Sequence, residues 1–106
     1  MTISPVEGVF AEMDALSERQ SKAVAQRLRE DDSIRSVLAT KQGRAVMSWI
    51  LNLTHVHEST FATDAITLAA LAAQRDIGLV VLARLEEVDY ENVLLMTKES
   101  REDGND

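Results

Sequence analysis

One apolar stretch constrains the fold more than any other feature of the chain. Residues 68–85 read LAALAAQRDIGLVVLARL, a run of alanine and leucine that favours a helix. On a helical wheel two apolar faces lie nearly opposite one another, the first formed by Ile66, Ala70, Ala73, Ile77 and Val81 and the second by Leu68, Leu71, Leu79 and Leu82. A helix that is apolar on two sides packs between neighbours, so we predict a long central helix over residues 61–86.

A segment as apolar as residues 68–85 could alternatively form a transmembrane helix. A span needs about 20 mostly apolar residues. Here the run is interrupted by Thr67 and by the polar group Gln74, Arg75 and Asp76. Because charged side chains are costly in the centre of a bilayer, we expect no stable membrane span.

The N-terminal third predicts a helix with one apolar stripe. Ser4, Pro5 and Glu7 form a capping box with proline at the first helical position, so the helix begins at about Pro5. Its stripe consists of Val6, Val9, Phe10, Met13 and Leu16. We interpret Val6, Val9, Phe10 and Met13 as a partner-binding surface, and a second copy of the chain as the expected partner. The helix either restarts at Ser17 or continues as an exposed arm to about Glu30.

Shorter elements are predicted between the arm and the central helix. Asp31, Asp32 and Ser33 interrupt the pattern and predict a short helical turn that holds Ile34, Val37 and Leu38. Thr40 is a suitable N-cap for an amphipathic helix over residues 41–53. Its expected apolar side is Gly43, Val46, Met47, Ile50 and Leu53, its polar side is Arg44, Ser48 and Asn52, and Trp49 and Leu51 lie at the margins. Asp89 predicts the start of a last helix.

These elements together predict an all-α fold, a small bundle of four to five helices around the long central helix. At 106 residues the chain suits a single domain. Within it we expect an N-terminal helical arm over residues 1–32, a core over residues 33–100 and an acidic tail over residues 101–106.

Charge and motif content exclude several classes of function. The formal net charge of −7 argues against direct binding to nucleic acid, although residues 33–60 carry a local excess of basic groups. His55, His57 and Glu58 are suitable zinc ligands, but their spacing fits a loop poorly and no further ligand is evident, so we expect no metal site. Catalytic signatures and phosphate-binding loops are absent from the sequence. We therefore expect neither an enzyme nor a cofactor.

Arg75 and Gly78 are unusual residues for the centre of an apolar helix. Arg75 emerges in the middle of the leucine face. There it either lays its stem over the leucines with its charged head at the edge of the bundle, or meets a carboxylate from another element, or contacts a partner protein. Gly78 costs about 1 kcal/mol relative to alanine, a cost usually justified by close approach of another backbone. We predict that the helix over residues 41–53 crosses there, and that Gly43 serves a similar purpose.

The order of these features resembles a family of small helical phage proteins, the Bbp-nineteen-like proteins of podophages. The resemblance covers residues 34–100, and its matching positions are Gly43 and Arg44, then Phe61, then Arg75 with Gly78. The chain departs from the family pattern at Leu38, where phenylalanine is usual, and at Ala73 and Gln74, which replace a glycine and an arginine.

The resemblance implies a non-enzymatic structural protein of the virion, assembled in several copies with itself and with other phage proteins. Its place would be the internal core, the neck or tail, or the set of ejected proteins, with the host cytoplasm as its location during assembly. One alternative is a small helical adaptor or regulator that binds a phage or host protein. The other is an accessory subunit of the DNA-packaging machine.

Overall fold

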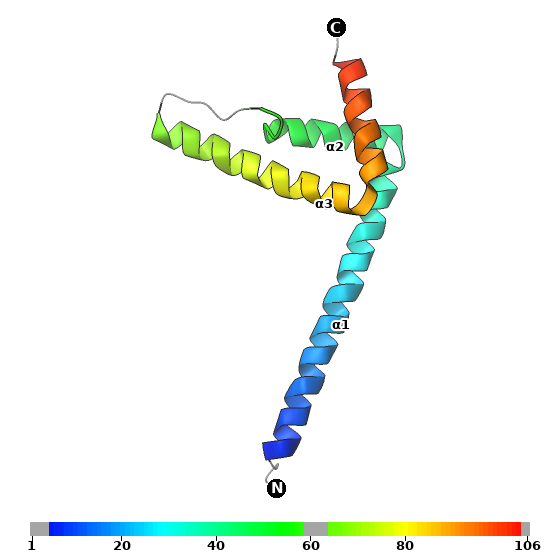
Figure 1. Cartoon of the computed structure of the whole chain (residues 1–106), viewed down its shortest axis with the longest axis vertical. Coiled ribbons are helices and arrows are strands. Elements are labelled where there is room, and N and C mark those ends of the chain that lie inside the picture. The colour runs from blue at the N-terminus through cyan, green and yellow to red at the C-terminus, as the bar shows by residue number, and fades with distance from the viewer. Residues whose placement is uncertain (1–4, 59–63, 105–106) are drawn as a thin grey trace. The chain divides into compact units, whose positions relative to one another are not determined.

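The computed structural model describes residues 5–58 and 64–104, and these are helical with no strand (Figure 1). Three helices occupy the described residues: α1 (Pro5–Leu38), α2 (Lys41–Leu53) and α3 (Ala65–Asp103). The all-α prediction is therefore confirmed. The predicted number of four to five helices is wrong, because two expected boundaries lie inside continuous helices.

The first of these boundaries lies in α1. The helix passes through Asp31, Asp32 and Ser33 without interruption and ends at Leu38. Aspartate and serine cost only about 0.7 kcal/mol or less per residue inside a helix. Burial of Ile34 and Leu38 at the end of α1 outweighs that cost, because burial of one such side chain contributes about 1.5–3 kcal/mol. Asp31, Asp32 and Ser33 therefore lie in the interior of α1, although aspartate and serine are favoured at helix N-caps.

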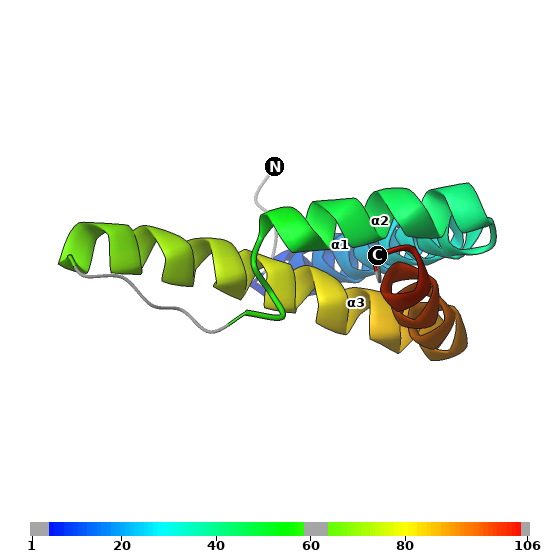
Figure 2. The same cartoon turned by 90° about the horizontal axis from the view of Figure 1, so that it is seen from above.

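α2 begins where the sequence predicts. The Thr40 hydroxyl accepts a hydrogen bond of 3.0 Å from the Gly43 backbone N–H, so the predicted N-cap is confirmed. After α2 the chain turns at Thr54 and His55, and His55 has a positive φ of 57°. α2 and the first part of α3 then lie side by side and antiparallel, as two views of the molecule show (Figures 1 and 2).

α3 contains the second misplaced boundary. Asp64 caps its start by accepting a 2.8 Å hydrogen bond from the Thr67 backbone N–H, and the first helical residue, Ala65, lies four residues after the predicted start at residue 61. At Asp89 the backbone leaves helical geometry, with φ −154° and ψ 74°. The Asp89 carboxylate accepts a 3.3 Å hydrogen bond from the Asn92 N–H, as an N-cap does. The predicted helix start at Asp89 is thus present as a kink within α3.

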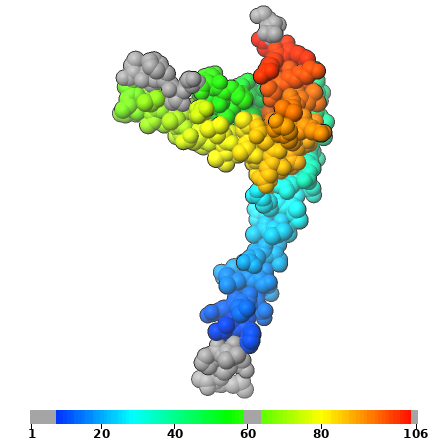
Figure 3. All heavy atoms as spheres, in the orientation of Figure 1, coloured from blue at the N-terminus to red at the C-terminus, as the bar shows by residue number. Residues whose placement is uncertain are grey.

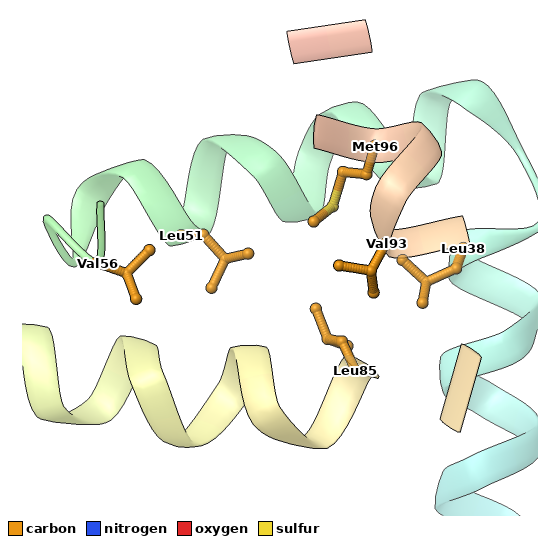
Figure 4. Packing of buried hydrophobic residues seen from close by; sticks show 6 residues of the cluster. All are labelled: Leu38, Leu51, Val56, Leu85, Val93 and Met96. Atoms are coloured by element: carbon orange, nitrogen blue, oxygen red, sulfur yellow. The ribbon is translucent and has the colours of Figure 1, made fainter. Parts of the chain in front are cut away.

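The core lies where α2, both parts of α3 and the end of α1 meet. Figure 4 shows six buried hydrophobic residues converging from these elements and, for Val56, from the turn after α2: Leu38, Leu51, Val56, Leu85, Val93 and Met96. Leu38 and Leu51 are the most enclosed, at 0% and 1% exposure. The kink at Asp89 matters here, because it brings the second part of α3 across α2 and places Val93 and Met96 in this cluster.

Several residues of the predicted apolar side of α2 are exposed in the structure. Val46 and Leu53 are more than half exposed, and Ile50 is 37% exposed. Leu51, expected at the margin, is buried, and so is Arg44 from the expected polar side. The prediction of the apolar side is therefore correct only for Met47, which packs against the core, because the wheel identifies the more apolar side of α2 and not the side that the rest of the fold covers.

The first part of α3 is also less covered than predicted. Ile66, Ile77 and Val80 are between 62% and 85% exposed, whereas Val81 and Leu82 pack against the core. Figure 3 shows the surface of this segment, coloured yellow-green to yellow, facing the viewer. Among the described elements only α2 packs extensively on α3, so the predicted central helix between neighbours is wrong. By length and composition, α3 could also cross a membrane.

The chain divides into two compact units, Met1–Asp32 and Ser33–Asp106. The first unit consists of α1 up to Asp32, and its described side chains are almost all exposed. The second unit contains the end of α1, α2 and α3, and with them the whole core.

Candidate functional site

A groove lies between α2 and the second part of α3 in the second unit. It has a volume of about 300 Å³. Its lining comprises Lys41, Arg44, Ala45, Ser48, Trp49 and Asn52 from α2, and Met96, Glu99, Ser100, Asp103 and Gly104 from α3 and its C-cap. The polar side of α2 thus faces the end of α3, and Trp49 stands at the groove with 61% exposure.

Arg44 holds this groove together through three hydrogen bonds. Its Nε donates to Glu99 Oε2 at 3.0 Å and its Nη2 donates to Glu99 Oε1 at 2.8 Å, a bidentate pair. Its Nη1 donates to the Leu38 backbone oxygen at 2.8 Å. That oxygen belongs to the last residue of α1 and has no acceptor role within the helix. One side chain therefore ties the end of α1 and the second part of α3 to α2.

The pair also shifts the ionisation of both partners. The hydrogen bond from Arg44 lowers the pKa of the Glu99 carboxyl below its ordinary value; burial opposes this shift, and the charges of Arg44 and Lys41 reinforce it. The hydrogen bond to Glu99 likewise raises the pKa of the Arg44 guanidinium. Both groups are therefore charged at neutral pH, and the pair fastens α2 to the second part of α3.

Gly43 and Gly78 allow close contacts, but with elements other than those predicted. A Cβ at Gly78 would lie 2.7 Å from the Thr54 Cβ and 3.1 Å from the Val56 Cβ. The close neighbour of Gly78 is thus the turn after α2, not the crossing α2 helix. A Cβ at Gly43 would lie 2.8 Å from the carbonyl carbon of Val37, so Gly43 makes room for the end of α1.

Arg75 contacts the same turn. Its Nε donates a 3.1 Å hydrogen bond to the Glu58 backbone oxygen. A carboxylate was one of the predicted structural partners of Arg75, and this contact uses a carbonyl group instead. Phe61, another of the positions that match the family pattern, lies outside the described residues.

The residues considered as metal ligands have separate surroundings. His55 Nδ1 and Glu58 Oε2 lie 2.8 Å apart on the surface, whereas His57 lines a neighbouring hollow with Met96 and Arg101. Among the described residues no group of three or more histidine, cysteine, aspartate or glutamate side chains could hold a metal ion.

The predicted partner-binding stripe lies on α1. Val9, Phe10 and Met13 are 54%, 60% and 57% exposed, whereas the side chain of Val6 lies outside the described part of the chain. The exposed apolar series continues with Leu16, Val24 and Leu28. Their role in binding a partner stays a prediction.

Sequence reasoning missed Glu99, although a signal for it exists. Glu99 follows Met96 by three residues, and Met96 follows Val93 by three, so all three share one side of the helix. A carboxylate that continues a buried apolar side requires a partner. Arg44 lies on the predicted polar side of α2, and because 55 positions separate it from Glu99, no local sequence pattern pairs the two residues.

The comparison with protein families now identifies the class of protein. The model of the Bbp19-like phage protein family matches residues 34–97, more than half of the chain. The chain therefore belongs to this family, and the resemblance noted in the sequence is confirmed. The match spans the end of α1, α2 and most of α3, including Arg44 and Gly78. Searches of curated proteins and of solved structures find no significant match.

Proposed function

We propose that this phage protein is a non-enzymatic structural component of the virion, assembled in several copies with itself and with other virion proteins. The observation that carries the proposal is the large share of apolar surface that remains exposed outside a core of six buried hydrophobic residues. Exposed apolar faces occur on α1, on the outer side of α2 and on the first part of α3. Extended apolar surface of this kind marks sites of protein association.

The groove supports a structural role over a catalytic one. Its charged centre, Arg44 with Glu99, is a bidentate pair engaged within the fold. The acidic character of the chain, with a net charge of −7, favours protein partners over DNA. No membrane span is part of the proposal, because Arg75 in the apolar half of α3 is hydrogen-bonded to Glu58 at the turn after α2.

Mass spectrometry of particles purified from the phage that encodes this chain tests the proposal. We expect the protein in intact particles at a constant ratio to the major capsid protein. A comparison with particles that have ejected their DNA separates a component of the neck or tail from an ejected protein. Presence in the infected-cell lysate and absence from purified particles would contradict the proposal and favour the adaptor.

A further inference from the structure

The first part of α1 combines an exposed apolar stripe with an unusual segregation of charge. Residues 7–18 contain four acidic residues and no basic one: Glu7, Glu12, Asp14 and Glu18. Residues 19–29 contain four basic residues and no acidic one: Arg19, Lys22, Arg27 and Arg29. Both segments belong to one uninterrupted helix. Residues 7–29 of α1 therefore comprise an acidic half and a basic half of nearly equal length, and three further acidic residues, Glu30, Asp31 and Asp32, follow the basic half.

Two pairs of exposed apolar residues on α1 are placed symmetrically about the point where the charge changes sign. Val9 and Leu28 lie at equal distances along the helix from the midpoint between residues 18 and 19, and so do Met13 and Val24. Val9, Met13, Val24 and Leu28 are each between 54% and 59% exposed. Ser17 and Gln20 flank the midpoint symmetrically, on the same side of the helix.

We propose that α1 pairs with α1 of a second copy of this chain in antiparallel orientation, with the two-fold axis at the midpoint between residues 18 and 19. In this register Met13 of one copy meets Val24 of the other, and Val9 meets Leu28. The spacing of Phe10, Met13, Ser17, Gln20 and Val24 alternates between three and four residues, as in a coiled-coil seam. A two-fold arrangement makes one surface complementary to itself.

Charge selects the antiparallel orientation over the parallel one. In the antiparallel pair the acidic half of each copy lies along the basic half of the other. In a parallel pair acidic would face acidic and basic would face basic over the whole length, which is unfavourable. At about 0.1 M salt the screening length is roughly 10 Å, comparable with the spacing of packed helices, so the preference persists in ordinary buffers.

This inference deepens the proposed assembly in several copies, on which it rests, and the chain suits a direct test because it contains no cysteine. Two variants of the full chain, Met13→Cys and Val24→Cys, are prepared separately and treated with a short bifunctional thiol reagent, alone and mixed. In the antiparallel pair residue 13 lies about 16 Å along the axis from its own counterpart. We therefore expect crosslinked dimer in the mixture and none with either variant alone.

A matched pair on the opposite side of the helix serves as control. Ala11→Cys and Gln26→Cys have the same symmetric placement, and both side chains are exposed. A mixture of these two variants should give no dimer. Crosslinking of Met13→Cys with itself would indicate a parallel pair and overturn the proposal, and so would equal crosslinking of the control pair. Failure of the Met13 and Val24 mixture to crosslink, with oligomers present by light scattering, would overturn it as well.

A charge exchange tests the same pairing without altering the stripe. The double variant Asp14→Lys with Glu18→Lys should self-associate at least tenfold more weakly at low salt, as should Arg19→Glu with Lys22→Glu, and an equimolar mixture should recover the original association. Glu91→Lys with Glu102→Lys makes the same change in net charge on exposed parts of α3 and should have little effect. Equal weakening by this control would overturn the electrostatic basis.

Detection of the protein in purified particles is independent of all these results, so failure of the pairing and failure of the virion role are distinguishable.

Discussion

Two parts of α1 have similar apolar spacing and different surroundings. Val24 and Leu28 are 59% and 58% exposed, whereas Ile34 packs against the core and Leu38 is fully buried. All four lie on one helix, and each pair is separated by four residues. The comparison teaches that helical periodicity identifies an apolar side but not the element that covers it. Leu38 is covered within the chain, and we assign the covering of Val24 and Leu28 to a second copy.

The largest expected effect on stability comes from truncating the side chain of Leu38, the fully buried residue at the end of α1. Leu38→Ala should reduce the free energy of unfolding by about 2–5 kcal/mol, because it leaves a cavity in a site with 0% exposure. The matched variant Leu28→Ala should change it by only about 0.5 kcal/mol in dilute solution. Chemical denaturation followed by circular dichroism measures both. Equal losses would show that Leu28 is covered in the isolated chain.

Substitution of two glycines, one in close contact with another element and one without such a contact, tests the close approach of the turn after α2 to α3. Gly78→Leu should destabilise the fold by about 1–3 kcal/mol, because its side chain would overlap Thr54 and Val56. Gly8→Leu provides the control, since a Cβ at Gly8 would meet nothing within 4 Å. Leucine is a better helix former than glycine, so the control should be neutral or slightly stabilising. Thermal unfolding of both variants distinguishes them, and an unaffected Gly78→Leu variant would show that the turn after α2 does not approach α3 closely.

Glu99→Gln should have a smaller effect at neutral pH, because glutamine still accepts one hydrogen bond from Arg44. The pH dependence is the sharper measurement. The pKa of Glu99 is lowered in the folded state, so its contribution to stability is present above the ordinary glutamate pKa and is lost as the pH falls through the lowered value. The melting temperature of the original protein should therefore fall more steeply than that of Glu99→Gln on acidification below about pH 4.5. If the melting temperatures of the two proteins fall in parallel with pH, the ion pair of Arg44 and Glu99 does not stabilise the fold. Glu102→Gln, on an exposed side chain, is the control.

Local features of the fold were predictable from the sequence. Thr40 and Asp89 were recognised as caps because the interaction of a cap with the next turn depends on neighbouring residues alone. The helical class followed from composition and periodicity for the same reason. Asp31, Asp32 and Ser33 have similar local preferences, but burial of Ile34 and Leu38 overrides them.

Features that depend on distant contacts were not predictable. The buried side of α2 is decided by Arg44 and Glu99, which meet only because α3 kinks at Asp89 and crosses α2. Without that contact the more apolar side, with Val46 and Ile50, is the reasonable choice. In the candidate groove, Arg44 was identified through the family resemblance, whereas Glu99 required knowledge of the tertiary fold.

Arg75→Leu is expected to have the smallest effect on stability, about 0.5 kcal/mol, because it removes a hydrogen bond at an exposed site where the Glu58 carbonyl can bond to water instead. Arg75 lies on the part of α3 whose apolar surface is largely exposed, so the same variant tests whether that surface is used in assembly. Unchanged melting temperature with loss of the protein from purified particles would assign Arg75 to a partner contact. If neither the melting temperature nor incorporation into particles changes, the role of Arg75 is limited to its contact with the turn after α2. A loss as large as that of Leu38→Ala would contradict the exposed position, since only a buried interaction has an effect of that size.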